Sequence, residues 1–400
     1  MLFLAMIRKI ILILLVLGLS GPADSQEVPG MASDSASHLR ISLITCGPGF
    51  NEVWEVFGHT AIRIVDSIHH TDLVYNYGTF DGFDANFEIN FMRGKLLYTL
   101  SVYPFREFMP EYVQTKRSVY EQLLLMTDVQ KSKIRDMLDI NAEPANRAYK
   151  YDFFFDNCAT RIRDIFPKAA GNEFVYGQVL SKEVSITFRE IINRYFYTKQ
   201  WVRLGVNILL GSKIDKVMTD KDVMFLPDYL SKGLGTARMD GQKVAAPSLR
   251  ILEGIDSEPE PVNFPLILTW SIALLTIAGL YVKRLKVLGK GMSFLVLLVT
   301  GLLGCLILVM WFGTNHEGCR DNYNVLWALP TNLILAFGRP KGAPRYAMAG
   351  IGLVLVTLLL HVFRVQGLLF MEMFPILLTL VCIYHTIIRQ SKLKSATLNA

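Results

Sequence analysis

A cysteine and a histidine that could act as a nucleophile and its base are the first chemical feature of this sequence. Cys158 follows Asn157, which favours the N-cap position, and the next residues predict a helix over 158–165. Free backbone N–H groups and the helix dipole favour negative charge there, so we expect the pKa of this thiol to be lowered. His59 opens an alternating, β-branched stretch behind Gly58, which predicts a strand over 59–65. A strand histidine brought to this cysteine would serve as its general base.

Such a pair needs a third group that accepts the second N–H of the imidazole. The neighbouring predicted strand, 73–77, offers Asn76 as the first candidate and Tyr77 as the second. The oxyanion hole would come from the backbone N–H of Cys158 and a nearby donor.

Further polar residues around this pair are candidates for binding substrate. Alternation places Arg63 on the His59 face of its strand, and Arg161 lies one turn into the cysteine helix. Either arginine could bind a phosphate or an oxyanion. The alternative is a structural ion pair, with Asp152, Asp156 or Asp164 as partners. The candidate substrate-binding residues of this part of the chain are Arg63, Tyr77, Asn157 and Arg161.

The other four cysteines, Cys46, Cys305, Cys319 and Cys382, show neither the spacing of a metal site nor that of a disulfide framework. Cys46 ends a predicted strand, where it either packs or lines the same cleft as Cys158. We therefore expect no metal and no cofactor.

The elements that position the pair indicate an α+β domain over residues 39–255. Strands are predicted at 39–45, 59–65, 73–77, 95–102 and 118–125, and the aromatic run 151–156 is predicted to be another strand directly before Cys158. Helices are predicted at 128–140, 187–196, 200–210 and 220–230, the last interrupted by Pro227. Asp240-Gly241 predicts a hairpin turn.

The sequence also predicts export and a membrane-spanning region. The chain is 52% hydrophobic and 19% charged, and its modest net charge of +6 gives no nucleic-acid signature. Residues 1–25 have the layout of a secretory signal, with an uncleaved anchor as the alternative, and 26–38 form a flexible tether. After a proline-rich linker, 256–263, an all-α bundle of about five spans occupies 264–390, followed by a cytoplasmic tail, 391–400.

Five apolar segments make up this bundle, at 264–282, 292–312, 323–337, 346–363 and 368–388. The third is short and carries Pro330 and Asn332, so it is predicted to be broken or re-entrant. Lysines and arginines follow the first, third and fifth segments, which places those loops in the cytoplasm and the α+β domain outside it.

The same rule puts the polar loop 313–324 on the side of the exported domain. It is either a solvated loop or the rim of a substrate entrance. In the second case His316, Glu317, Asn322 and Asn324 would face lipid headgroups or the acceptor.

The motifs of this chain carry a family resemblance. A histidine on a strand followed much later by Asn157-Cys158 at a helix start resembles the circularly permuted papain-like proteins of the NlpC and lecithin:retinol acyltransferase type. The chain more closely resembles the Lnb family of bacterial lipoprotein N-acyltransferases, over nearly its whole length. The segments that carry this resemblance are LITCGPG (43–49), VFGHTAIR (56–63), YNYGTF (75–80), DNCATR (156–161) and NYNVLW (322–327).

The resemblance implies an acyl transfer at the periplasmic face of the bacterial inner membrane. Cys158 would take a fatty acyl chain from a phospholipid as a thioester. The acyl group would then pass to the free α-amino group of the diacylglyceryl-modified N-terminal cysteine of a lipoprotein. The third catalytic member stays open, because the second histidine of the retinol-type relatives has no counterpart after His59.

Three rival functions remain at this point. A membrane-anchored Cys/His amidase or peptidase of the cell wall would release free peptide, and a phospholipase would transfer the acyl group to water. A non-catalytic envelope scaffold would tolerate loss of Cys158 and His59.

Overall fold

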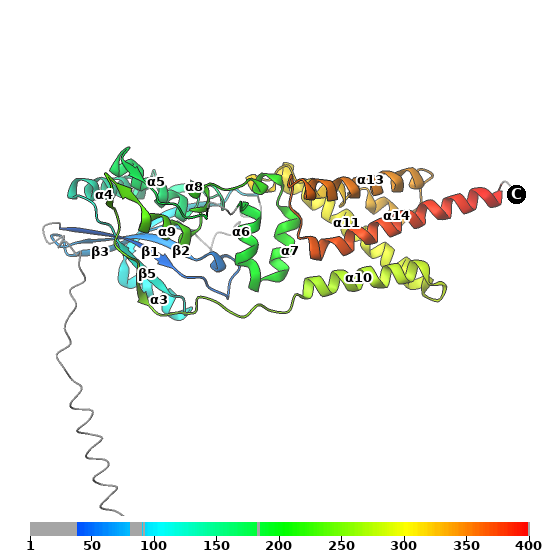
Figure 1. Cartoon of the computed structure of the whole chain (residues 1–400), viewed down its shortest axis with the longest axis horizontal. Coiled ribbons are helices and arrows are strands. Elements are labelled where there is room, and N and C mark those ends of the chain that lie inside the picture. Colours follow the sequence, from blue (N-terminus) through cyan, green and yellow to red (C-terminus); the bar gives the residue numbers. More distant parts are fainter. Residues whose placement is uncertain (1–37, 81–89, 91–92, 182–184, 399–400) are drawn as a thin grey trace, which may run out of the picture. The chain divides into compact units, whose positions relative to one another are not determined.

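The computed structural model describes residues 38–80, 90, 93–181 and 185–398. The predicted signal peptide, 1–25, and the tether up to residue 37 lie outside these residues. From Leu39 onward, a mixed α/β domain with one large sheet precedes a region of long helices (Figure 1).

Seven strands form one antiparallel sheet in the order β10-β5-β1-β2-β3-β4-β6. Their bounds are β1 (Leu39–Cys46), β2 (His59–Asp66), β3 (Thr71–Thr79), β4 (Leu97–Pro104), β5 (Val119–Leu123), β6 (Ala148–Lys150) and β10 (Leu249–Leu252). The five strands predicted between residues 39 and 125 are confirmed, with ends that differ by a few residues.

Helices cover both faces of this sheet, as the alternation of the strands requires. Ile62 and Tyr75 belong to the larger core together with residues of α4 (Asp128–Ala142) and α5 (Cys158–Ala170). Ala61 and Val74 point to the opposite face, where they pack with Phe108 of α3 (Phe105–Gln114). The sheet therefore holds the cysteine helix against one face while its other face is closed by α3.

The aromatic run 151–156 is not a strand, so that prediction is wrong. The carboxylate of Asp152 accepts the backbone N–H groups of Phe154 and Phe155 at 2.9 and 3.0 Å. Asp152 and Asp156 then close the turn through two backbone hydrogen bonds. Such local side-chain bonds compete with strand formation, whatever the β-propensity of aromatic residues. The chain therefore reaches Cys158 through a tight turn.

The second half of the domain is mostly helical. It contains α6 (Phe188–Tyr195), η2 (Phe196–Thr198), α7 (Gln200–Leu209), η3 (Ser212–Asp215), α8 (Asp220–Val223) and α9 (Pro227–Thr236). Pro227 is the first residue of α9, a position where its missing N–H costs nothing, so the predicted helix 220–230 is split in two. A small sheet adds β7 (Phe174–Val175), β8 (Arg238–Met239) and β9 (Gln242–Lys243). Asp240 and Gly241 both have positive φ, which confirms the predicted hairpin turn.

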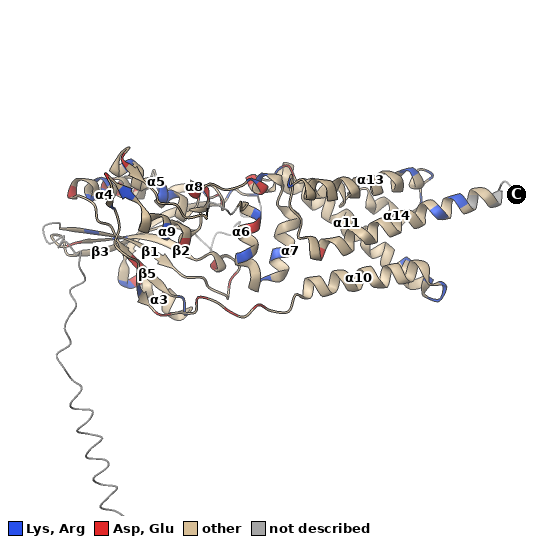
Figure 2. Cartoon of the chain, in the orientation of Figure 1, with Lys and Arg blue, Asp and Glu red and all other residues tan. Residues whose placement is uncertain are grey.

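Four helices of the second region are long and apolar enough to cross a membrane: α10 (Phe264–Tyr281), α11 (Lys286–Gly313), α13 (Ala343–Val362) and α14 (Phe370–Leu398). The short η4 (Lys283–Leu285) precedes α11. Lysines and arginines gather at one end of these helices, away from the sheet, as Figure 2 shows. This is the distribution that the positive-inside rule gives for cytoplasmic loops.

The third predicted segment, 323–337, is interrupted. It contains η6 (Tyr323–Leu326) and the six-residue α12 (Asn332–Phe337), each far shorter than the ~20 residues that cross the hydrocarbon layer. Gly304 of α11 lets this segment approach closely, because a Cβ at that position would lie 1.9 Å from the carbonyl oxygen of Ala328. The buried side chain of Asn332 binds Thr300, Tyr346 and Tyr384, so the break is stabilised by polar contacts within the helical region.

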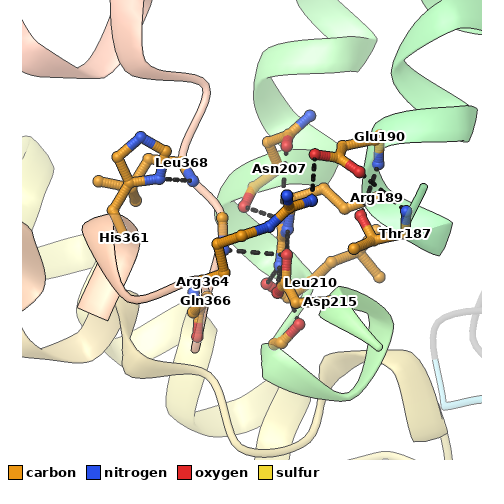
Figure 3. Close-up of polar contacts among 12 residues, drawn as sticks. Thr187, Arg189, Glu190, Asn207, Leu210, Asp215, His361, Arg364, Gln366 and Leu368 are labelled. Atoms are coloured by element: carbon orange, nitrogen blue, oxygen red, sulfur yellow. Dashed lines mark hydrogen bonds and ion pairs between the residues drawn. The ribbon is translucent and has the colours of Figure 1, made fainter. Parts of the chain in front are cut away.

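A buried ion pair of the α/β domain contacts the helical region, as Figure 3 shows. The guanidinium of Arg189 binds Asp215 at 2.8 Å and donates to the carbonyl oxygens of Leu210 and Gly211, just beyond α7. Asp215 also accepts the N–H of Gly367, from the connection between α13 and α14. The side chains of the pair are only 3% and 7% exposed.

We expect Arg189→Ala to lower the free energy of unfolding by about 3–5 kcal/mol, because it leaves a buried carboxylate without its charge partner. The matched control is Arg364→Ala, which breaks the exposed pair with Glu190 and should cost about 1 kcal/mol or less. Thermal unfolding in detergent measures both variants. Equal midpoints for them would contradict the structural role of the buried pair.

Candidate active site

His59 is the first residue of β2, and the backbone before it explains its placement. The short helix η1 (Trp54–Phe57) ends at Gly58, which has φ +73°. A Cβ at position 58 would lie 2.6 Å from the carbonyl oxygen of Cys46, so glycine is needed both for this conformation and for the close approach. The chain then enters β2 with His59 paired opposite Cys46 of β1.

Asn76 of β3 lies against the imidazole of His59. Its side-chain oxygen is 2.6 Å from His59 Nε2, and its amide group donates to the hydroxyl of Tyr103 at 2.7 Å. In this network Nε2 carries the proton, which leaves Nδ1 of His59 as the atom that can accept one. The structure thus brings together the predicted base and the first candidate for its partner.

Cys158 is the first residue of α5, as predicted. The side chain of Asn157 accepts the N–H of Thr160 at 2.9 Å, and the hydroxyl of Thr160 accepts the N–H of Asn157 at 2.8 Å. This reciprocal capping box fixes the first turn of the helix. The backbone N–H groups of Thr60, Cys158 and Ala159 hydrogen-bond to the sulfur, which favours the thiolate form.

Gly78, at the end of β3, is where the cysteine and the histidine meet. It has φ +90°, and a Cβ placed on it would lie 3.8 Å from Cys158 Cβ and 4.0 Å from His59 Cε1. Both side chains therefore face the same small space above this glycine. An arrangement of thiol, imidazole and amide in this order can carry out nucleophilic acyl transfer.

Two family models match this chain, and both describe parts of the same protein family. The family model of the Lnb N-terminal periplasmic domain matches residues 27–194, and that of the Lnb transmembrane domain matches residues 255–394. The chain belongs to the Lnb family. This confirms the resemblance seen in the sequence and makes the chain a multi-pass membrane protein with a periplasmic domain. Membership indicates an enzyme with a role in lipoprotein processing. No curated protein and no solved structure matched the chain.

The Cys158 thiol and the His59 imidazole of this Lnb protein are both neutral at neutral pH, which corrects the expected lowering of the thiol pKa. Burial raises the pKa of Cys158 to about 11, although the three N–H groups near the sulfur act in the opposite direction. Burial also lowers the pKa of His59 to about 4, against the effect of its hydrogen bond to Asn76. Desolvation disfavours both charged forms and outweighs the helix start. The imidazole is therefore an unprotonated base at neutral pH.

Three predicted substrate-binding residues of the Lnb domain have structural contacts instead. Arg63 binds Asp72 and Glu121 and stacks on a phenylalanine ring, so its guanidinium is occupied by ion pairs. Tyr77 is 1% exposed, and its hydroxyl accepts from Asn141. Arg161 forms a two-point ion pair with Asp156. Arg161 thus has the ion-pair alternative with one of its predicted partners, Asp156. Arg63 is also ion-paired, but its partners Asp72 and Glu121 are not among the predicted ones.

The capping residue Asn157 is also committed to the fold. It is 4% exposed, and besides capping α5 its amide group donates to the carbonyl oxygens of Phe153 and Phe225. The side chain of Asn157 thus binds the backbone of the domain, and its predicted contact with substrate stays a prediction.

Asn322 and Asn324 do not face lipid headgroups or an acceptor, which corrects that prediction. Both are fully buried and donate to the carbonyl oxygens of residues 207–209, at the end of α7. The last carbonyl groups of a helix lack partners within the helix, and these two amides supply them. A cluster of polar residues between two apolar segments is therefore as compatible with capping a helix end as with binding a substrate.

The polar loop 313–324 contacts the turn that precedes Cys158. It contains η5 (Glu317–Cys319), and a Cβ on Gly318 would lie 2.9 Å from the ring of Phe154, in the turn before Cys158. His316 is partly buried in this loop. Its contact with substrate stays a prediction.

Three neighbours of the candidate site residues were not predicted from the sequence: Gly78, Tyr103 and Tyr149. The glycine after the Asn76 strand was a usable signal, because a glycine at a strand end often marks a close approach. Tyr103 and Tyr149 could not be predicted, because they lie on β4 and β6. Only the order of strands in the sheet, β3-β4-β6, brings these two strands close to β3. Among the described residues, no group of three or more His, Cys, Asp or Glu side chains is placed to hold a metal ion.

Asn76 contacts the imidazole of His59, so its effect on a reaction of this pair would act through that ring. We expect Asn76→Ala to lower kcat about 10- to 100-fold, which corresponds to the loss of a hydrogen bond to an imidazolium. Asn76→Asp keeps an acceptor and should restore part of the rate. Its carboxylate favours the protonated imidazole, so the acid limb of its pH profile should move to higher pH. Equal rates and equal profiles for the two variants would show that this contact does not position the base.

Proposed function

We propose that this chain transfers a fatty acyl group from a phospholipid, through a thioester on Cys158, to a lipoprotein. The acceptor is the α-amino group of the diacylglyceryl-modified N-terminal cysteine. The observation that carries the proposal is the shared space above Gly78, which Cys158 and His59 both face in a periplasmic domain of the Lnb family.

In the first step the thiol attacks the ester carbonyl of the phospholipid while His59 Nδ1 takes the thiol proton. Because both groups are neutral at rest, the proton moves as the carbon–sulfur bond forms. The tetrahedral intermediate then loses its glycerol oxygen, which receives the proton from His59. The products are a thioester on Cys158 and a lysophospholipid.

In the second step the lipoprotein amine attacks the thioester. His59 accepts a proton from the amine, the carbon–sulfur bond breaks, and the sulfur regains a proton. A thioester is reactive enough to acylate an amine, so no further activation is required. The amide product is the N-acylated lipoprotein.

The contacts of α7 support a reaction at the membrane surface. Arg203 of α7 binds Glu372 at 2.8 Å, and Glu372 also accepts from Asn263, so α7 is tied to the first turns of α10 and α14. Both substrates are lipids of the same bilayer, and a domain fixed at this level needs no free diffusion to meet them. We place the bundle in the bacterial inner membrane. The broken segment 323–337 would complete five crossings, because α11 ends on the domain side and α13 begins on the basic side.

Incubating the purified chain with phospholipid vesicles and no acceptor tests the first step. We expect a fatty acyl group on the peptide that contains Cys158, removable by neutral hydroxylamine as a thioester is. Adding a diacylated lipopeptide should clear this group and produce an amide. Release of free fatty acid at a rate unaffected by the lipopeptide would favour the phospholipase instead.

A further inference from the structure

Tyr149 has an unused hydrogen-bond donor beside the catalytic pair. This residue of β6 is 6% exposed, and its hydroxyl oxygen is buried without a hydrogen-bond partner in the described part of the chain. A buried polar group left unpaired costs about 1–3 kcal/mol. Native structures keep few such groups, and each calls for an explanation.

The position of the Tyr149 hydroxyl explains why its donor is left unpaired. A Cβ placed on Gly78 would lie 3.9 Å from the Tyr149 hydroxyl oxygen, nearly the same distance as from Cys158 Cβ and His59 Cε1. Nucleophile, base and orphan donor thus border the same space. A carbonyl carbon attacked by Cys158 would bring its oxygen into this space.

The ring of Tyr149 is held rigidly for this purpose. The guanidinium of Arg161 lies 3.7 Å from the ring centroid and is itself fixed by Asp156. Tyr77 packs edge-on against the same ring at 6.2 Å. Burial raises the pKa of Tyr149, so the hydroxyl keeps its proton at neutral pH and can donate it to a hydrogen bond.

We infer that the Tyr149 hydroxyl is the side-chain donor that binds the oxyanion of both tetrahedral intermediates formed on Cys158. The inference rests on the proposed acyl transfer and adds a catalytic residue to it. Tyr149 makes a hydrogen bond and transfers no proton: the bond appears as the carbonyl oxygen becomes negative and weakens when the carbonyl reforms. Arg161 is then a positioning residue for Tyr149.

Tyr149→Phe tests the inference. Loss of one preorganised oxyanion donor lowers kcat by about 10²- to 10³-fold. We expect this fall in thioester formation from phospholipid vesicles and in transfer to the lipopeptide, with little change in KM. The midpoint of thermal unfolding should stay the same or rise, because the variant removes an unpaired buried hydroxyl.

Tyr75→Phe is the matched control, because Tyr75 is also a core tyrosine of the sheet but its hydroxyl binds Asp139 on α4. It should lower the thermal midpoint and leave kcat within a few-fold of the wild type. If Tyr149 were merely structural, its variant would follow the control in both measurements, and the inference would be overturned.

Infrared spectroscopy gives a readout that does not depend on rate. With a phospholipid carrying a ¹³C-labelled ester carbonyl, the thioester carbonyl of the wild type should absorb at lower frequency than that of Tyr149→Phe, because it accepts a hydrogen bond. Equal frequencies together with equal kcat would refute the role of Tyr149 while leaving acyl transfer intact. If the wild type forms no thioester at all, the proposed function itself fails, and the inference fails with it.

Discussion

Replacing Cys158 with alanine should abolish acyl transfer, with a fall of at least about 10⁴-fold in thioester formation and in lipoprotein acylation. The variant removes the atom that forms the covalent intermediate, and no other group of the site can replace it. Its folding should be little affected, because the capping box that fixes the start of α5 belongs to Asn157 and Thr160. Mass spectrometry of the chain after incubation with phospholipid vesicles measures the effect.

Cys46→Ala is the control for this variant. Cys46 is a buried cysteine directly opposite His59, but burial raises its pKa to about 12 and it is hydrogen-bonded to Tyr112. We expect this variant to keep its activity within a few-fold of the wild type. An acyl group on Cys46 in the Cys158→Ala protein would show that Cys46 of β1 can act as the nucleophile, and this would contradict the account.

His59→Ala should lower kcat by about 10²- to 10⁴-fold, the contribution of a well-placed general base. The pH dependence separates this loss from a structural one. His59 is unprotonated above a pKa of about 4, so wild-type activity should be flat near neutral pH and fall as the pH approaches 4. Without the base the thiol must ionise by itself, so the residual activity of the variant should rise tenfold per pH unit toward the Cys158 pKa of about 11.

His69→Ala is the matched control, because His69 lies in the same domain but its side chain is 66% exposed and paired with Asp66. It should leave both the rate and the flat profile unchanged. A His59→Ala enzyme with the wild-type pH profile would show that another group takes the thiol proton.

The contacts within the sheet could be predicted from the sequence because alternation determines which residues share a face. His59 and Asn76 were identified on neighbouring strands, and their 2.6 Å contact follows from the antiparallel pairing of β2 and β3. The start of α5 was equally predictable, since Asn157 and Thr160 form a local cap. These features depend on residues close in sequence or adjacent in the sheet.

The features that could not be predicted depend on burial and on distant contacts. The pKa of Cys158 reflects how much water the surrounding core excludes, which the helix start alone does not reveal. The amides of Asn322 and Asn324 bind the end of a helix more than a hundred residues earlier, so their loop resembled a binding rim in the sequence. Tyr149 reaches the site through β6, a three-residue strand with too short a pattern to detect.

Mass spectrometry of a lipoprotein N-terminus tests the central claim most directly. The sample would come from cells that carry the wild-type chain, the Cys158→Ala variant or no copy of the chain. We predict a third, amide-linked acyl group on the N-terminal cysteine with the wild type, and free α-amino groups in the other two strains. N-acylated lipoprotein in cells that carry Cys158→Ala alone would contradict the account.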